Sequence, residues 1–112
     1  MPLEPARRVT KAYIRGLRDY VDAQKDQRLA GPGAAEIVDI IARYSTVKDT
    51  NVLRAIIPHY VDPDGRVNLE SMRKDLQFFR DIGEFTDAKF RVEDIVDMSF
   101  VDAALRTLEP WR

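Results

Sequence analysis

The chain has 112 residues, no cysteine, and 18 lysines and arginines against 19 aspartates and glutamates. This length suits one ordinary domain. The net charge of −1 excludes a nucleic-acid binder that relies on bulk positive charge, and the lack of cysteine excludes disulfides and thiolate metal sites. No apolar run reaches the roughly 18–20 residues needed to cross a bilayer, and the N-terminus lacks a basic segment followed by an apolar one.

Hydrophobic periodicity predicts helices throughout the chain. Apolar residues recur at intervals of three and four in five segments, which are 5–29, 34–44, 50–60, 69–82 and 99–108. No segment has the period-two alternation of a strand. We therefore predict an all-α protein with a single helical domain over 1–112, folded as a compact bundle of about five helices with a long first helix.

The first predicted helix combines an apolar stripe with a basic face. Gly16 lies in its interior, where glycine costs up to about 1 kcal/mol relative to alanine, and we interpret it as a place where another element approaches closely. Residues 1–30 hold more basic than acidic side chains, which a solvated helix face explains better than a partner surface. The spacing predicts a buried stripe made of Val9, Tyr13, Leu17, Tyr20, Val21 and Gln24.

Turn and capping residues mark the ends of the elements. Gly31-Pro32-Gly33 breaks the first helix, and Pro58 closes or kinks the third. Asp62-Pro63-Asp64-Gly65 is a strong turn signal. A short helical turn is predicted at 92–96, and the predicted helix caps are Asp49 or Thr50, Asn68, Gly83 and Ser99.

The Asp-Pro-Asp-Gly segment also suggests calcium binding. An EF-hand loop needs oxygen ligands at positions 1, 3 and 5 and a glycine at position 6. Counting from Asp62, the glycine stands at position 4 and Arg66 at position 5, so the ligand ring cannot close in that way. We therefore favour a turn over a metal site.

His59 is the only histidine, so a metal site would need it together with carboxylates, and no His-x-x-x-His or Glu-x-x-His spacing supports one. The sequence also singles out no nucleophile for which it could serve as a base. We predict a partly buried, hydrogen-bonded structural histidine. Ser45, Ser71 and Ser99 occupy link or cap positions, and none lies in a nucleophile elbow.

Two further groups of residues admit a functional and a structural interpretation. Glu93, Asp94, Asp97 and Asp102 could pair as acid and base, but helix-start capping and favourable charge near helix N-termini explain Asp97 and Asp102 better. Tyr13 and Tyr20 could contact a ligand or a partner helix, although core packing with solvated hydroxyls is favoured. We therefore predict no enzyme, no catalytic, cofactor-binding or metal site and no cofactor, and we assign no ligand-binding residue.

The order of the segments resembles a known family. The resemblance runs over about residues 5–108 and includes Ala12–Tyr20, Ala34–Val38, Val47–Asp49, Asp62–Asn68 and Val96–Leu105. The series is similar to the C-terminal region of the substrate-binding proteins of bacterial ABC importers, in the family for nitrate, sulfonate, taurine and thiamine precursors. No single motif is decisive, but the collinear series is fairly specific.

The resemblance implies a helical C-terminal piece of a much longer protein, in which two α/β lobes close over a small ligand. Such a piece is non-catalytic and periplasmic, and its partners are the rest of the binding protein and the ABC permease. The cleft-lining strands would lie upstream of it. The alternative is a free-standing helical module for protein interaction or oligomerisation, with the helices at 5–29 and 34–44 as the surface for self-association.

Overall fold

The computed structural model describes residues 3–111, and in this range the protein is helical with no strand. The all-α prediction is confirmed for this part of the chain. None of its helices is long and apolar enough to cross a membrane. The elements are α1 (Leu3–Asp22), α2 (Ala34–Tyr44), α3 (Thr50–Ala55), α4 (Leu69–Asp81), the 3₁₀ turn η1 (Val92–Asp94) and α5 (Ser99–Leu105).

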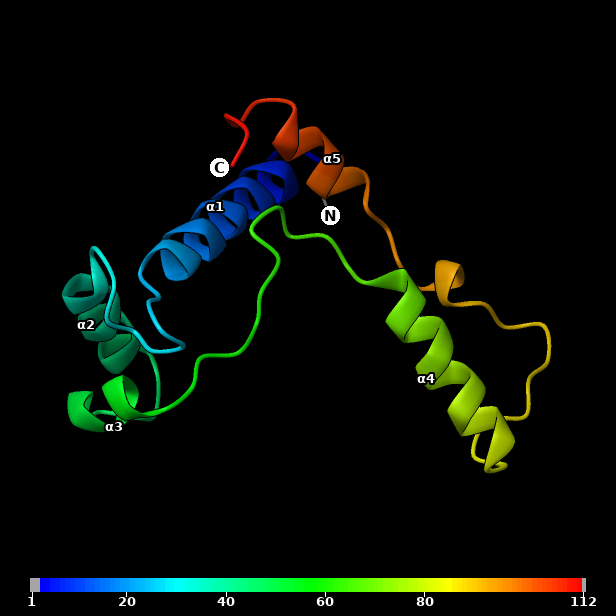
Figure 1. Ribbon diagram of the computed structural model, residues 1–112. Helices are drawn as coiled ribbons and strands as arrows, with labels where there is room; N and C mark the ends of the chain where they lie inside the picture. The colour runs from blue at the N-terminus through cyan, green and yellow to red at the C-terminus, as the bar shows by residue number, and fades with distance from the viewer. Residues whose placement is uncertain (1–2, 112) are drawn as a thin grey trace.

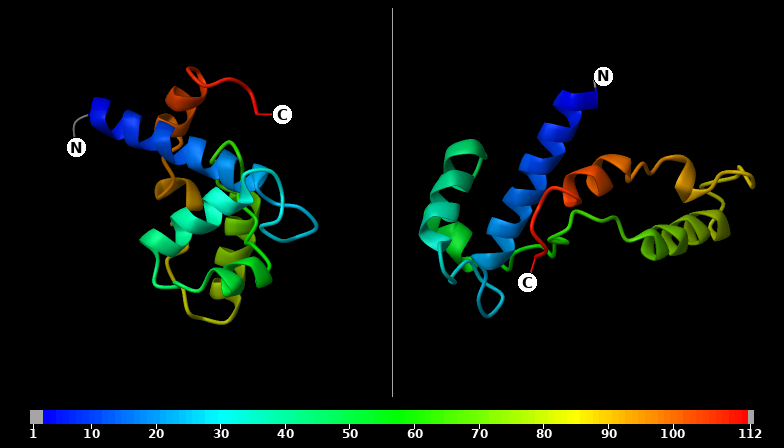
Figure 2. Two further views of the ribbon diagram at one scale, coloured as in Figure 1. Left: turned by 90° about the vertical axis from the view of Figure 1, so that its left-hand side faces the viewer. Right: turned by 90° about the horizontal axis from the view of Figure 1, so that it is seen from above.

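Helix α1 forms the centre of the molecule (Figure 1). Helix α5 packs beside its N-terminal half, while α2 contacts its other end and packs on α3. Helix α4, the loop after it and η1 form an arm (residues 69–94) that extends away from the other helices. Figure 2 confirms that α2 and α4 lie on opposite sides of α1. Among the described elements, α4 contacts only η1.

The prediction of a compact bundle is wrong. The radius of gyration is 17.4 Å, whereas a compact domain of this length has about 13 Å. The accessible surface is 8,556 Å² for a mass of 12.9 kDa, about 2,200 Å² more than a compact monomer of that mass exposes. Irregular segments connect the arm to the other helices on both sides, and α4 lies apart from α1 (Figure 1).

The core is small and is formed by the end of α1 and the segment after it, together with α2 and α3. Its buried members are Ala23, Leu29, Ala34, Val38 and Leu53, with Tyr20, Ile37, Ile41 and Ala42 packed around them. A second contact buries Ala6, Ile14 and Ala104. The arm contributes one buried residue, Val92, and α4 contributes none.

The first helix ends at Asp22, seven residues before the predicted end at 29. Asp26 and Gln27 adopt left-handed backbone angles, and Lys25 and Arg28 exchange backbone hydrogen bonds of 2.8 and 3.0 Å across them. This reversal brings Leu29 into the core, where only 2% of it is exposed. Burial of an apolar side chain therefore outweighs the helical pattern that runs through 23–29.

Helix α2 has the predicted limits, but three other helices end earlier than predicted. Helix α3 ends at Ala55, not 60, because a residue that precedes proline avoids the helical region, and Ile56 and Ile57 lead into Pro58. Helix α4 ends one residue before 82. Helix α5 ends at Leu105, not 108, and beyond it the Thr107 hydroxyl donates to the Ala104 carbonyl at 3.0 Å.

Most predicted caps are confirmed. Asp49 accepts a hydrogen bond from the Asn51 amide, Asn68 accepts one from the Ser71 amide, and Gly83 has a φ of 80°. The exception is Ser99, which is the first helical residue of α5. The separate helical turn predicted at 92–96 is present but shorter, because η1 covers only Val92–Asp94.

The buried face of α1 is rotated from the predicted one. Leu17, Tyr20, Val21 and Gln24 are half-buried as expected, but Val9 is 69% exposed and Tyr13 is 62% exposed. The buried positions are instead Ala6 and Ile14. The rotation follows from the position of α5 and of the 62–65 turn, which cover the Ile14 side of the helix.

Candidate functional site

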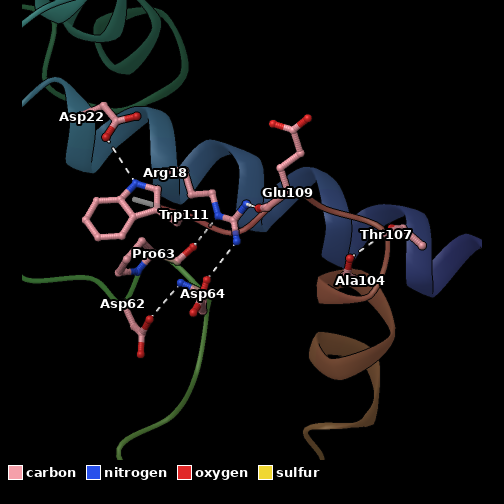
Figure 3. Close-up of polar contacts among 9 residues, drawn as sticks. All are labelled: Arg18, Asp22, Asp62, Pro63, Asp64, Ala104, Thr107, Glu109 and Trp111. Carbon is pink, nitrogen blue, oxygen red and sulfur yellow. Dashed lines mark hydrogen bonds and ion pairs between the residues drawn. The ribbon is translucent and has the colours of Figure 1, made fainter.

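The most connected polar group of the described residues is Arg18, in the last third of α1. Its side chain is 13% exposed, and its guanidinium binds two segments that are distant in sequence (Figure 3). Nε donates to the Pro63 carbonyl at 3.0 Å, and Nη2 donates to Asp64 Oδ1 at 2.9 Å. Nη1 donates to the Glu109 carbonyl at 2.6 Å. We call this arrangement the Arg18 clasp.

The turn at 62–65 presents its acceptors to Arg18 in a fixed geometry. The Gly65 amide donates to the Asp62 carbonyl at 2.9 Å, and Asp62 Oδ1 accepts from the Asp64 amide at 2.8 Å. Gly65 has a φ of 70°, and a Cβ added there would lie 3.1 Å from a side-chain carbon of Ile14. A glycine is therefore required both by the backbone and by the contact with α1. The predicted turn is confirmed.

The C-terminal segment lies along α1 on the same side as the turn (Figure 3). Besides the Glu109 carbonyl, it contributes Trp111, whose Nε1 donates to Asp22 Oδ1 at 3.3 Å. Arg18 therefore joins three segments: α1, the turn and the tail. Because its donors are directed at acceptors of the protein itself, the clasp is a structural joint and not a binding group for a substrate.

Both carboxylates of the turn have partners within the protein. Asp62 is used within the turn and Asp64 is used by Arg18. No group of three or more histidine or carboxylate side chains within residues 3–111 is placed to hold a metal ion.

The acidic residues of the C-terminal half do not come together as an acid–base pair. Glu93 accepts from Arg73 Nε at 2.9 Å, which joins η1 to α4, and this bond holds the pKa of Glu93 below its ordinary value. Asp94 accepts from the Arg91 amide at 2.9 Å, and this bond lowers the pKa of the Asp94 carboxyl. Both carboxylates are used to hold the arm together.

The other two acids serve α5. Asp97 accepts from the Ser99 amide at 2.9 Å, and its hydrogen bonds with Ser99 lower its pKa. Asp102 accepts from Arg66 Nη1 at 3.2 Å. The predicted capping role of Asp97 is confirmed, whereas Asp102 pairs with the segment that leads to α4.

His59 and the two tyrosines of α1 are not assembled into a site. His59 is exposed, so the prediction of a partly buried histidine is wrong. Tyr13 is exposed too, which contradicts the core interpretation for this residue. Tyr20 packs against the core as predicted, and burial raises the pKa of its phenol.

Sequence reasoning missed the clasp. Arg18 stands among other basic residues of α1 and has no distinguishing local signal. Its partners lie 45 to 91 residues further along the chain, so only the tertiary arrangement identifies it. Comparison of the chain with known protein families, with curated proteins and with solved structures gives no match.

Proposed function

We propose that this chain is the helical C-terminal part of the solute-binding component of an ABC importer. Its uncovered apolar faces would then pack against the α/β lobes of that protein. On this proposal the chain takes no part in catalysis and acts in the periplasm, where it completes the fold of the binding protein and contributes to surfaces that meet the permease. The collinear resemblance over residues 5–108 supports it.

The observation that carries the proposal is the state of α4. This 13-residue helix has no buried residue, and its side chains Phe78 and Phe79, together with Ile82 directly after it, are each about half exposed. A helix in a soluble protein gains most of its stability by burying an apolar face. Helix α4 contacts only the short η1, so it needs a partner that the described residues do not supply.

Besides α4, helix α1 also has an uncovered apolar face, and it leads to the same conclusion. Apart from the Ile14 face, it presents Pro5, Val9, Tyr13 and Gly16 on exposed positions at helical spacing. A Cβ added to Gly16 would meet nothing within 4 Å. The predicted close approach at Gly16 is therefore not made by any described element, although the glycine costs helix stability. A missing lobe that packs closely on α1 would account for both facts.

The proposal is tested by hydrogen exchange of the isolated 112-residue chain. We expect the α4 amides to be protected much less than the amides of α2, because α4 lacks its partner. Protection of the α4 amides equal to that of α2 in a monomer would contradict the proposal. The flanking genome provides a second test: permease and ATPase genes, or an in-phase upstream reading frame, are expected.

A free-standing oligomerisation module is the second candidate. The same exposed side chains favour it, because a second copy could cover them. The two candidates differ in the gene: a module of this kind has its own start codon at Met1 and no in-phase upstream reading frame. They also differ in solution, since a module melts cooperatively as an oligomer, with α4 protected.

A further inference from the structure

A cluster of basic side chains lies where α1 packs on α5. The first hollow there, of about 380 Å³, is lined by both helices and the two residues after α5, with Ala103 and Ala104 among the lining residues. A second hollow, of about 420 Å³, adjoins it and shares Lys11 and Thr107 with it. Arg18, which lines the second hollow, is engaged in the clasp, and we call the other basic side chains of the two hollows the basic seam: Arg7, Arg8, Lys11, Arg15 and Arg106.

None of these five side chains has a hydrogen bond or an ion pair within residues 3–111. The contrast with the second half of the chain is clear, because all four arginines between residues 66 and 91 are engaged by carboxylates or carbonyls. Acids with helical spacing to the seam are present: Glu4 is four residues before Arg8, and Asp19 is four residues after Arg15. Neither pair forms.

The seam also sets like charges beside one another. Arg7 and Lys11, and then Lys11 and Arg15, are four residues apart on α1, a spacing at which equal charges destabilise a helix. Arg106, the residue directly after α5, also lines the first hollow. A solvated helix face would explain the α1 residues alone, but it does not explain why a second element adds a cation to them.

We propose that the basic seam binds a phosphate-type oxyanion. The first hollow holds four basic side chains against one acid, Glu4, so it retains more positive charge than a single carboxylate neutralises. A guanidinium group can bind two phosphate oxygens at once in a bidentate contact, and three of the four cations are arginines. The hollow, whose lining includes the small side chains of Ala103 and Ala104, has a volume of about 380 Å³ in which an anion of this kind fits. The source is a soluble phosphate ester or the headgroup of an anionic lipid.

The test measures the binding of pyrophosphate to the 112-residue chain by titration calorimetry at low salt. We expect saturable binding at one site that weakens as salt is added. The seam variant Arg7→Gln/Lys11→Gln/Arg106→Gln should bind at least about tenfold more weakly, which corresponds to about 1.4 kcal/mol. The control Lys25→Gln/Arg43→Gln/Arg54→Gln removes the same charge from exposed positions outside the seam and should keep the wild-type affinity.

Two further measurements complete the test. The first does not depend on whether a variant folds, and the second identifies whether the anion is a soluble phosphate or a lipid headgroup. Amide shifts of the wild-type chain on adding pyrophosphate should be largest at 4–11 and 103–107, which needs no variant to fold. Vesicles of phosphatidylglycerol and of phosphatidylcholine test the lipid source. Seam-dependent binding only to the anionic vesicles identifies the ligand as a lipid headgroup. Binding of pyrophosphate in solution identifies it as a soluble phosphate. If neither probe binds, or if the seam and control variants weaken binding equally, the proposal is overturned.

Discussion

Two glycines of this protein have opposite surroundings. Gly16, inside α1, has open space where a Cβ would be, whereas at Gly31 a Cβ would lie 2.9 Å from the Gln24 carbonyl oxygen and 3.0 Å from the Ala23 backbone. Gly31 is needed because the chain returns to Ala23, whose carbonyl accepts the Gly31 amide at 2.8 Å. Gly16 has no such reason within the described residues.

The two glycines therefore respond in opposite ways to alanine. In the monomer, at low protein concentration, Gly16→Ala should raise the free energy of unfolding by up to about 1 kcal/mol, because alanine is the better helix former. Gly31→Ala should lower it by about 1–3 kcal/mol, because the methyl group meets backbone atoms that cannot move aside easily. Chemical denaturation followed by circular dichroism measures both. A destabilising Gly16→Ala would mean that another surface covers this face in solution.

Arg18 is the residue that ties the chain together over the longest distance. Arg18→Ala removes three hydrogen bonds, one of them to a carboxylate, and should lower the free energy of unfolding by about 2–3 kcal/mol. Arg18→Lys keeps the charge, but one ammonium group cannot reach all three acceptors, so most of the loss should remain. Arg15→Ala, an exposed neighbour without a bonded partner, is the control and should change stability by less than about 0.5 kcal/mol.

At the scale of elements, the arm is held by polar contacts more than by a core. Arg73 joins α4 to Glu93 of η1, and Arg80 binds the loop between them through the carbonyls of Asp87 and Phe90. The rings of Phe85 and Phe90 contact each other within that loop, with centroids 5.1 Å apart and ring planes inclined by 51°. With Val92 as its only buried residue, the arm depends on exposed ion pairs, which are individually weak.

The arm should therefore loosen in acid before the α1–α2–α3 core does. The pKa values of Glu93 and Asp94 are lower in the folded arm than in an unfolded chain, so their stabilising contribution is present at neutral pH and is lost as the pH falls through the folded values. Hydrogen exchange at α4 and η1 should accelerate over that acidic range. Glu93→Gln should reduce this pH dependence, and Glu70→Gln, which breaks only an exposed pair with Lys74, should leave it unchanged.

At the scale of the whole molecule, the open shape leaves an unusual amount of surface. The excess of about 2,200 Å² over a compact monomer exceeds what each partner contributes to a standard protein–protein interface, about 800 Å². The uncovered surface includes large apolar side chains on α1, on α3 and on the arm. The isolated chain is therefore expected to self-associate.

Sedimentation velocity should show association that increases with protein concentration. The substitution Tyr13→Glu places a charge on the uncovered face of α1 and should shift the equilibrium toward monomer by about tenfold or more, because an unpaired buried charge is costly. Thr46→Glu, in the exposed link between α2 and α3, serves as the matched control. A strict monomer at high concentration would show that α1 does not associate with a second copy.

Sequence alone determined what depends on neighbours a few residues away. The helical class of the described part, the limits of α2, the turn at 62–65 and the caps at Asp49 and Asn68 all follow from local periodicity, turn chemistry and side-chain to backbone bonds. The predicted roles of Asp97 and Gly83 belong to the same class, because each acts within its own helix end.

Only the tertiary structure decided where α1 ends, which of its faces is buried and what holds Arg18. Residues 23–29 have a helical pattern, yet the chain reverses there because Leu29 gains a place in the core. The Ile14 face is chosen by α5 and by Gly65, and the Arg18 clasp and the basic seam both join α1 to segments near the other end of the chain. Contacts between residues so far apart in sequence leave no local pattern, because their energies depend on packing that exists only once the chain has folded.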